Sequence, residues 1–363
     1  MQACECGLGH GPDSRRCGGL RSEWNAPGPS TAAASFAVAL DPDIRDRLVL
    51  PAVCAPMMLV SGPELVTAAC KAGLMAGLPA HNARDLDEFT RWMEQIRRNL
   101  QSYGETDVPK QVGLLAVNIP AARPLHEIES YLNVCRRFGV RVIISAMGDP
   151  RALVERAHDV GCMVFHDVTT IRHAEKAIDA GVDGLVCIGA GGGGHCGLVS
   201  HLALIPKVRS MFDGTIVLAG CAASGAAIRA AEVLGADLCY LGTRFIATRE
   251  ARASAEYKDL LVAGGARDLV FTDRISGVGA NWLKASLRNR GIDPENPPSA
   301  SAPRNYDHLP EGVRPWRDLW SAGQGLEMID DIPTVAELVQ RLRREYVSAC
   351  MTPDMLSVAR RAR

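Results

Sequence analysis

A single histidine, His195, ends a glycine-rich loop in which a side chain could move a proton next to a bound ligand. The loop occupies residues 189–194 and follows an apolar run at 182–188. Four consecutive glycines add nothing to core packing, so they indicate a backbone that comes very close to a flat or charged group. A histidine titrates near neutral pH, and it can accept a proton or, once protonated, hold an anion. A surface loop with an incidental histidine is the alternative.

Two further glycine-bearing turns follow apolar runs, at Gly220 and at Gly242. Backbone N–H groups in such turns can bind a phosphate without a cation. Neither turn contains a lysine, and Arg244 is adjacent to the second. Each turn alone is equally consistent with an ordinary strand-to-helix connection. Together they favour a phosphate-bearing cofactor, because they would follow strands seven and eight of a barrel.

Eight apolar runs alternate with helical patterns and would position these loops. We expect strands at 48–54, 74–79, 112–117, 141–144, 162–165, 182–188, 215–220 and 237–241, with helices between them. In the helix at 202–212, Pro206 predicts that the ordered part begins near that proline. Repeated βα units predict a parallel sheet, and eight of them favour an α/β fold closed into a (β/α)8 TIM barrel.

Composition divides the chain into four parts. We expect a disordered N-terminal extension at 1–40, the barrel at 41–270, a C-terminal helical and loop extension packing on it at 271–350, and a tail at 351–363. An amphipathic helix at 334–346 closes the folded part. Zinc ligands could come from Cys4, Cys6, His10 and Cys17, but their spacing matches no common zinc pattern, so we predict no metal site.

The overall composition is that of an ordinary globular protein. The 363 residues are 47% hydrophobic and 22% charged, with a net charge of −1, which argues against nucleic-acid and membrane-surface partners. There is no run long enough to span a bilayer and no signal-peptide pattern at the start. Six cysteines lie within apolar patterns, as buried, reduced thiols of a cytoplasmic protein do: Cys54, Cys70, Cys135, Cys162, Cys187 and Cys239.

The glycine turns occur within motifs that resemble the nitronate monooxygenase family, formerly called 2-nitropropane dioxygenases. The motifs are Gly193-Gly194-His195-x-Gly197, Leu218-Ala219-Gly220, Gly235-Ala236-Asp237 and Gly242-Thr243-Arg244-Phe245-x-Ala247-Thr248. The resemblance extends from about residue 51 to residue 346. Members of this family are FMN-dependent TIM barrels related to FMN-type enoyl-ACP reductases. The resemblance therefore implies FMN as the cofactor, and a small carbon acid and O₂ as the reactants.

The resemblance also implies roles for individual residues. His195 matches the histidine that faces the flavin, and is the expected catalytic residue. The segment lining the isoalloxazine ring would be Pro56, Met57 and Met58, and Asn118 would contact FMN at the end of the third strand. Gly193 and Gly194 would lie along the flavin. The residues expected to hold the phosphate are Gly220, Cys221, Tyr240, Leu241, Gly242 and Thr243.

Several positions depart from the family pattern. Relatives often carry Gln at Ile188, Glu or Cys at Gly191 and a second glycine at Cys221, and some carry Lys at Asp167. These departures leave the flavin expectation in place and the substrate open. Among the other histidines, His166 is expected at the same barrel mouth as a secondary polar contact. His81 and His201 flank helices, and we expect them to be solvated.

Three functions remain open on the sequence. The leading one is FMN-dependent oxidation of alkyl nitronates, and of nitroalkanes if His195 acts as a base rather than as an anchor for the nitro group. The second is an NAD(P)H-dependent enoyl-thioester (enoyl-ACP) reductase on the same barrel. The third is a non-catalytic flavin-binding or substrate-delivery protein, in which His195 would be dispensable. A homodimer is left open.

Overall fold

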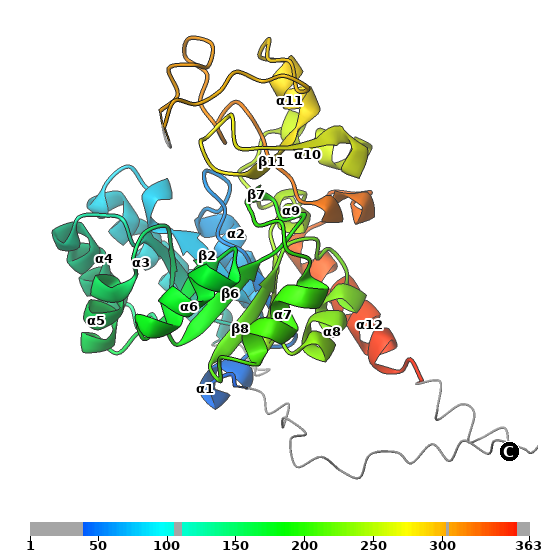
Figure 1. Cartoon of the computed structure of the whole chain (residues 1–363). Helices are drawn as coiled ribbons and strands as arrows, with labels where there is room; N and C mark the ends of the chain where they lie inside the picture. The colour runs from blue at the N-terminus through cyan, green and yellow to red at the C-terminus, as the bar shows by residue number, and fades with distance from the viewer. Residues whose placement is uncertain (1–38, 105–110, 303–304, 354–363) are drawn as a thin grey trace, which may run out of the picture. The chain divides into compact units, whose positions relative to one another are not determined.

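A closed barrel of eight parallel strands forms the centre of the computed structural model, which describes residues 39–104, 111–302 and 305–353 (Figure 1). The strands are β1 (Ala52–Cys54), β2 (Met75–Pro79), β3 (Leu115–Pro120), β4 (Val142–Ala146), β5 (Met163–Val168), β6 (Gly184–Ile188), β8 (Thr215–Ala219) and β9 (Leu238–Leu241). Closure comes from β1, in which Val53 pairs with Met75 on one side and Tyr240 on the other. The predicted TIM barrel is confirmed.

Strand alternation separates the barrel interior from the layer beneath the helices. One buried cluster contains alternate strand residues such as Val53, Phe165 and Val217, which fill the interior. The residues between them belong to the larger cluster that also includes the helices. Leu40 and Ile44 join the interior cluster from α1 (Pro42–Arg45) and the residues before it. The folded part of the chain therefore begins before residue 41.

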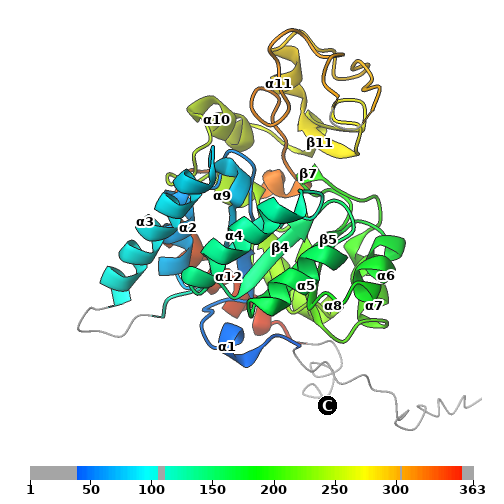
Figure 2. The same ribbon diagram turned by 90° about the vertical axis from the view of Figure 1, so that its left-hand side faces the viewer.

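A ring of helices covers the outside of the barrel (Figures 1 and 2). Its members are α2 (Pro63–Lys71), α3 (Leu86–Gly104), α4 (Leu125–Arg137), α5 (Arg151–Asp159), α6 (Ile171–Asp179), α7 (His201–Arg209), α8 (Gly225–Leu234) and α12 (Val335–Cys350). The last of these, the predicted closing helix, packs against α8 and α2. It is thus the eighth helix of the ring, although the sequence placed it in the C-terminal extension.

Helix α7 does not begin at Pro206, as the sequence predicted, but at His201. The Ser200 side chain caps it by accepting the Leu202 N–H, and this provides the start that the proline was expected to provide. A proline at this position only deprives the Leu202 carbonyl of its helical donor, and Leu202 is an exposed residue. The helix therefore tolerates the proline inside it.

The segment between β9 and α12 contains more structure than the predicted loops. It includes α9 (Thr243–Ile246), α10 (Ala255–Ala263), β10 (Leu269–Thr272), β11 (Ala280–Leu283), α11 (Lys284–Arg288) and two short 3₁₀ turns, at Ala266–Asp268 and Gln324–Met328. A further 3₁₀ turn, at Ala80–Asn82, follows β2. Strands β10 and β11 form an antiparallel sheet whose third strand is β7 (Gly194–His195). A separate core around Trp282, Leu287 and Leu319 supports this sheet.

The structure also bears on the predictions about cysteines, metal sites and membrane helices, as far as the described residues allow. The six cysteines of the apolar patterns are buried free thiols, as predicted. The N-terminal cysteines and His10, with most of the predicted extension, lie outside the described residues. Within the described ranges, no group of three or more His, Cys, Asp or Glu residues is placed to hold a metal ion. None of the helices described there combines the length and hydrophobicity that a membrane crossing requires.

Candidate active site at the barrel mouth

His195 lies on β7, so the glycine loop is joined directly to the sheet of the C-terminal segment. Gly194 pairs with Asn281, and His195 pairs with Ala280. The buried Asn281 amide also donates a 2.8 Å hydrogen bond to the Gly192 carbonyl. The loop that the sequence singled out is therefore held at its histidine end by a strand pairing and a side-chain hydrogen bond.

Ser276 fixes the proton position on the His195 ring. The serine hydroxyl, which is 2% exposed as a residue, donates to the Val278 carbonyl at 3.0 Å. Its oxygen lies 3.2 Å from His195 Nε2. Because the hydroxyl proton is already used, this oxygen accepts, and Nε2 carries the imidazole proton. The Trp316 ring meets the imidazole edge to face at 4.9 Å between centroids, which fixes the orientation of the histidine.

The glycine loop packs on a second glycine-bearing segment, around Gly323. That residue donates its N–H to the Thr243 hydroxyl at 2.9 Å, and Gln324 donates its N–H to the Gly191 carbonyl at 2.8 Å. A Cβ on Gly193 would lie 2.9 Å from the Gly323 nitrogen, so this close approach requires glycine. Gly193 is nevertheless exposed, which leaves another side of its backbone open to a ligand.

The two predicted phosphate turns have different backbone geometry. Gly220 and Cys221 both have left-handed φ values, +114° and +61°, and the Cys221 thiol donates to the Ala190 carbonyl at 3.1 Å. At Gly242, a Cβ would meet nothing closer than Ala55 Cβ and Met57 Sδ, each at 3.8 Å. There is space beside this turn, and it adjoins the segment predicted to line the flavin ring.

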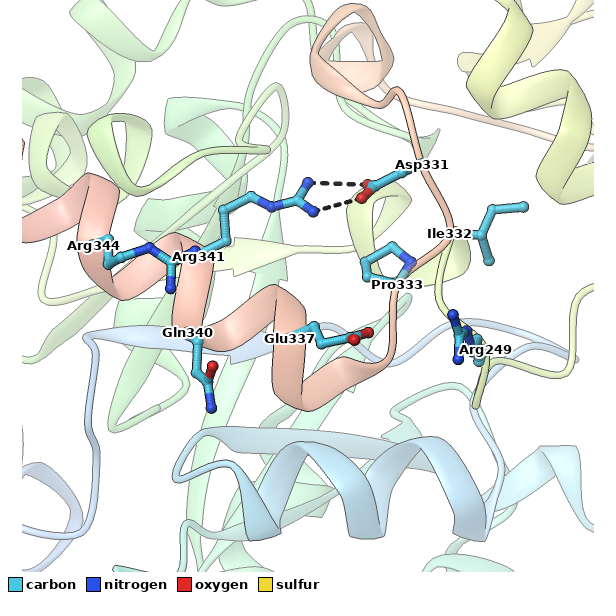
Figure 3. Close-up of a pocket in the computed structure, with 8 residues that line it drawn as sticks. All are labelled: Arg249, Asp331, Ile332, Pro333, Glu337, Gln340, Arg341 and Arg344. Atoms are coloured by element: carbon cyan, nitrogen blue, oxygen red, sulfur yellow. Dashed lines mark hydrogen bonds and ion pairs between the residues drawn. The ribbon is translucent and has the colours of Figure 1, made fainter.

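The Arg244 side chain, next to the second turn, is buried and already forms an ion pair within the protein. It is 1% exposed, and its guanidinium donates to the Asp331 carboxylate at 2.7 Å. Asp331 is also paired with Arg341 in a surface pocket of about 420 Å³, whose other lining residues are Arg249, Ile332, Pro333, Glu337, Gln340 and Arg344 (Figure 3). A phosphate held by the Gly242 turn would therefore rely on backbone groups, as the sequence suggested.

The remaining predicted ligand residues come from the ends of other strands. The sequence predicted that the third strand would end at residue 117, but β3 continues to Pro120, so Asn118 is its fourth residue. The Asn118 amide donates to the Ile144 carbonyl at 3.1 Å. Asn82, which the sequence did not single out, donates to the Met57 carbonyl at 3.0 Å and so fixes the segment from Pro56 to Met58. The Leu241 side chain belongs to the cluster beneath the helices, so only its backbone can face a ligand at the mouth.

Two polar atoms at the mouth have no partner within the described residues. They are the Tyr240 hydroxyl and Oδ1 of Asp167, and both are closed off from solvent. Burial raises the pKa of Asp167 to about 7. Burial and then the Asp167 charge raise the pKa of Tyr240 well above its ordinary value. With the space beside Gly242, these unsatisfied atoms are consistent with FMN, which is polar along its heterocycle and carries a phosphate.

The other histidines do not lie where the sequence placed them. His166 is on the outer side of β5, between Val164 and Val168 side chains that pack toward the helices, and its Nδ1 is 2.7 Å from the Ser145 hydroxyl. Burial lowers its pKa to about 4. It is a polar contact, but not one at the barrel mouth.

His201 and His81 were predicted to be solvated, and this was wrong. The His201 ring lies beneath the glycine turns, with Nε2 2.8 Å from the Ala219 carbonyl, and burial lowers its pKa. His81 is half-buried, and burial lowers its pKa to about 4. Both rings are thus neutral groups packed within the protein near pH 7.

A closed (β/α)8 barrel with glycine turns and a positioned histidine at the carboxyl ends of its strands defines a TIM-barrel enzyme. The family model for nitronate monooxygenase matches residues 45–345, and the chain belongs to this family, whose members are oxidoreductases. The resemblance inferred from the sequence motifs is thereby confirmed.

Similar proteins include oxidoreductases with different substrates. A nitronate monooxygenase of Paraburkholderia phytofirmans is 28% identical over 345 residues, covering 81% of this chain and 92% of the relative. A Mycobacterium tuberculosis protein named as a monooxygenase is 34% identical over 233 residues, covering 62% and 60%. A hydroxy-methyl-oxo-octahydroindene-carboxyl-CoA dehydrogenase of the same organism is 29% identical, covering 65% and 64%. The chain thus spans less than two thirds of the length of these last two.

Solved structures support the fold. A nitroalkane oxidase from Streptomyces ansochromogenes matches with a TM-score of 0.69 at 24% identity, covering 84% of this chain and 98% of the other. FabK from Thermotoga maritima matches with a TM-score of 0.66 at 22% identity, covering 86% and 97%. Likeness at this level of identity establishes a shared architecture.

Proposed function

We propose that this chain is an FMN-dependent oxidoreductase that oxidises alkyl nitronates with O₂. The observation that carries the proposal is the position of His195, which is held in one tautomer by Ser276 at the end of the glycine loop. A spectator histidine would not need a buried serine and an edge-on tryptophan to set its orientation. Membership of the nitronate monooxygenase family supports the same reaction class.

FMN would be held by groups from several strand ends. Backbone groups of Gly220, Cys221, Leu241, Gly242 and Thr243 would receive its phosphate, and its ring would lie among Pro56, Met57, Met58, Asn118, Gly193 and Gly194. The resemblance assigned Tyr240 to the phosphate as well, but its side chain belongs to the interior cluster of the barrel, so we assign it to the ring instead. When bound, the flavin would supply the electron acceptor that oxidises the carbon acid and is reoxidised by O₂. The left-handed backbone at Gly220 and Cys221 and the space beside Gly242 support this placement.

His195 has two roles open to it in this reaction. As a neutral imidazole, it would accept the α-proton of a nitroalkane and so generate the nitronate in place. As an imidazolium, it would hold the nitro oxygens of a nitronate that has already lost its proton. In both roles, the adjacent glycines keep side chains away from the face at which the substrate would lie.

The test is an anaerobic mixture of the purified, flavin-loaded protein with ethylnitronate or propionate 3-nitronate, recorded as the flavin absorbance spectrum. We expect rapid bleaching by the nitronate, and recovery of the oxidised spectrum when air is admitted. His195→Asn with matched flavin content distinguishes the two roles of this residue: the variant should lose bleaching by nitronates if the histidine anchors the nitro group, and keep it if the histidine is only the base. Rapid bleaching by NAD(P)H with negligible nitronate turnover would instead identify an enoyl-thioester reductase.

A further inference from the structure

The unpartnered groups of Asp167 and Tyr240 both face the interior of the barrel. Asp167 is two residues after Phe165 on β5, and Tyr240 is two residues after Leu238 on β9. Phe165, Leu238 and Tyr240 all belong to the interior cluster, so strand alternation directs Asp167 inward as well. The Asp167 charge raises the pKa of Tyr240, which places the two groups within electrostatic reach of each other.

Three other buried polar groups in the described part of the chain are satisfied by the protein itself. The Tyr257 hydroxyl donates to the Ser321 carbonyl, the Asn118 amide donates to the Ile144 carbonyl, and the Thr243 hydroxyl accepts from Gly323. Native proteins rarely leave a buried donor or acceptor unpaired, because each such group loses its hydrogen bonds to water. Tyr240 is 8% exposed and has no such compensation within the described residues. A ligand at the mouth is the natural source of the missing partners.

We propose that Asp167 and Tyr240 form a pair of hydrogen-bonding groups that holds the polar heterocyclic edge of the flavin. This inference rests on the proposed function, because it takes a flavin as the occupant of the mouth. The pyrimidine edge of a flavin presents carbonyl oxygens and an N–H group. A tyrosine hydroxyl can donate or accept toward that edge, whereas a carboxyl group can donate only while it carries its proton.

The surroundings of Asp167 leave a large fraction of its carboxyl protonated, and so able to donate, near neutral pH. Its cross-strand partner on β6 is the apolar Val186, and desolvation alone accounts for the rise of its pKa to about 7. The titratable group that faces it is Tyr240, which stays neutral across this range.

Riboflavin binding to the flavin-free protein, followed by quenching of flavin fluorescence, tests the pair. Riboflavin lacks the phosphate, so titration of a phosphate cannot contribute to the pH dependence. If only the protonated carboxyl binds, the wild-type affinity should fall by up to about thirtyfold between pH 6 and pH 8.5. Asp167→Asn, which keeps an N–H donor and cannot ionise, should bind with the same affinity at both pH values.

Tyr240→Phe should weaken riboflavin binding about threefold to tenfold at both pH values, which is the effect of one lost hydrogen bond. Its thermal stability without flavin should be unchanged or higher, because the deleted hydroxyl has no partner among the described residues. Tyr257→Phe is the matched control: it loses the bond to Ser321, so its stability should fall while its riboflavin affinity stays at the wild-type value.

The inference would be overturned if Asp167→Asn and Tyr240→Phe both bound riboflavin with wild-type affinity and the wild-type affinity did not change with pH. The proposed function would still stand in that case. A wild-type protein that binds neither riboflavin nor FMN would overturn both. Binding therefore separates the two claims without any measurement of turnover.

Discussion

Asp237 connects three parts of the chain at the start of β9, and its removal should destabilise the barrel strongly. One carboxylate oxygen accepts the Ala39 N–H at 2.9 Å, and the other accepts the Ile216 N–H at 2.8 Å and the Arg209 guanidinium at 2.6 Å. The Asp237 and Arg209 side chains are only 5% and 19% exposed. Asp237→Ala would leave the arginine charge without its counter-ion in a mostly buried site.

The size of the effect follows from that burial. Removing one partner of a buried ion pair costs about 3–5 kcal/mol, because the remaining charge stays desolvated. Arg209 also donates to the Gly235, Phe212 and Gly214 carbonyls, which hold it in place and prevent it from turning out to water. We therefore expect a loss of free energy of unfolding within that range.

Urea unfolding of the flavin-free protein, followed by tryptophan fluorescence, measures this loss without a contribution from ligand binding. Asp46→Ala is the control, because the side chains of the Arg45–Asp46 pair are 54% and 67% exposed and such pairs contribute less than about 1 kcal/mol. The reasoning would be refuted if the free energy of unfolding of Asp237→Ala lay within about 1 kcal/mol of the wild-type value and its slope against urea concentration were unchanged.

Four further predictions follow from the site and the fold. His195→Asn should lose turnover of neutral nitroalkanes by about two to four orders of magnitude if the histidine is the base, and keep much of its activity on preformed nitronates; full activity on both in steady-state assays would make it a spectator. Gly242→Asp should abolish FMN retention, measured as flavin released on denaturation, because a carboxylate would occupy the space beside the turn. The folded-state pKa of Asp167 is raised from 3.8 to about 7, so its contribution to stability is complete below pH 3.8 and is lost as the pH rises through 7, by about 4 kcal/mol in total; pH-dependent urea unfolding should show Asp167→Asn lacking this loss. A protein shortened at its N-terminus to begin at residue 39 should preserve flavin binding. One that begins at residue 41 lacks the buried Leu40 and should have a lower melting temperature.

The barrel could be predicted because its signals are local. Each strand is a short apolar run, and each helix follows it with its own cap or glycine stop, so alternation alone led to the closed fold. The sheet of β7, β10 and β11 gave no such signal. Strand β7 has two residues, one of them glycine, and β10 is half-exposed, so their pairing depends on contacts between distant parts of the sequence.

The same distinction applies to the site. His195 and the glycine turns were found from their own sequence, but Ser276 and Asn281, which orient them, are separated from their partners by 81 and 89 residues. Nothing near position 195 indicates such partners. His166 is a different case: β5 runs to Val168, and alternation from the inward-facing Phe165 would have directed this histidine outward.

The pairing of β7 with β11 has a consequence for chimeric proteins. Residues 271–320 lie outside the barrel ring and share a sheet with the histidine proposed to do the chemistry. Exchanging this segment for that of a relative would therefore change the backbone partner of His195 together with Ser276 and Trp316. A graft intended to alter substrate range should carry the glycine loop from the same donor, because the two segments form one transferable unit.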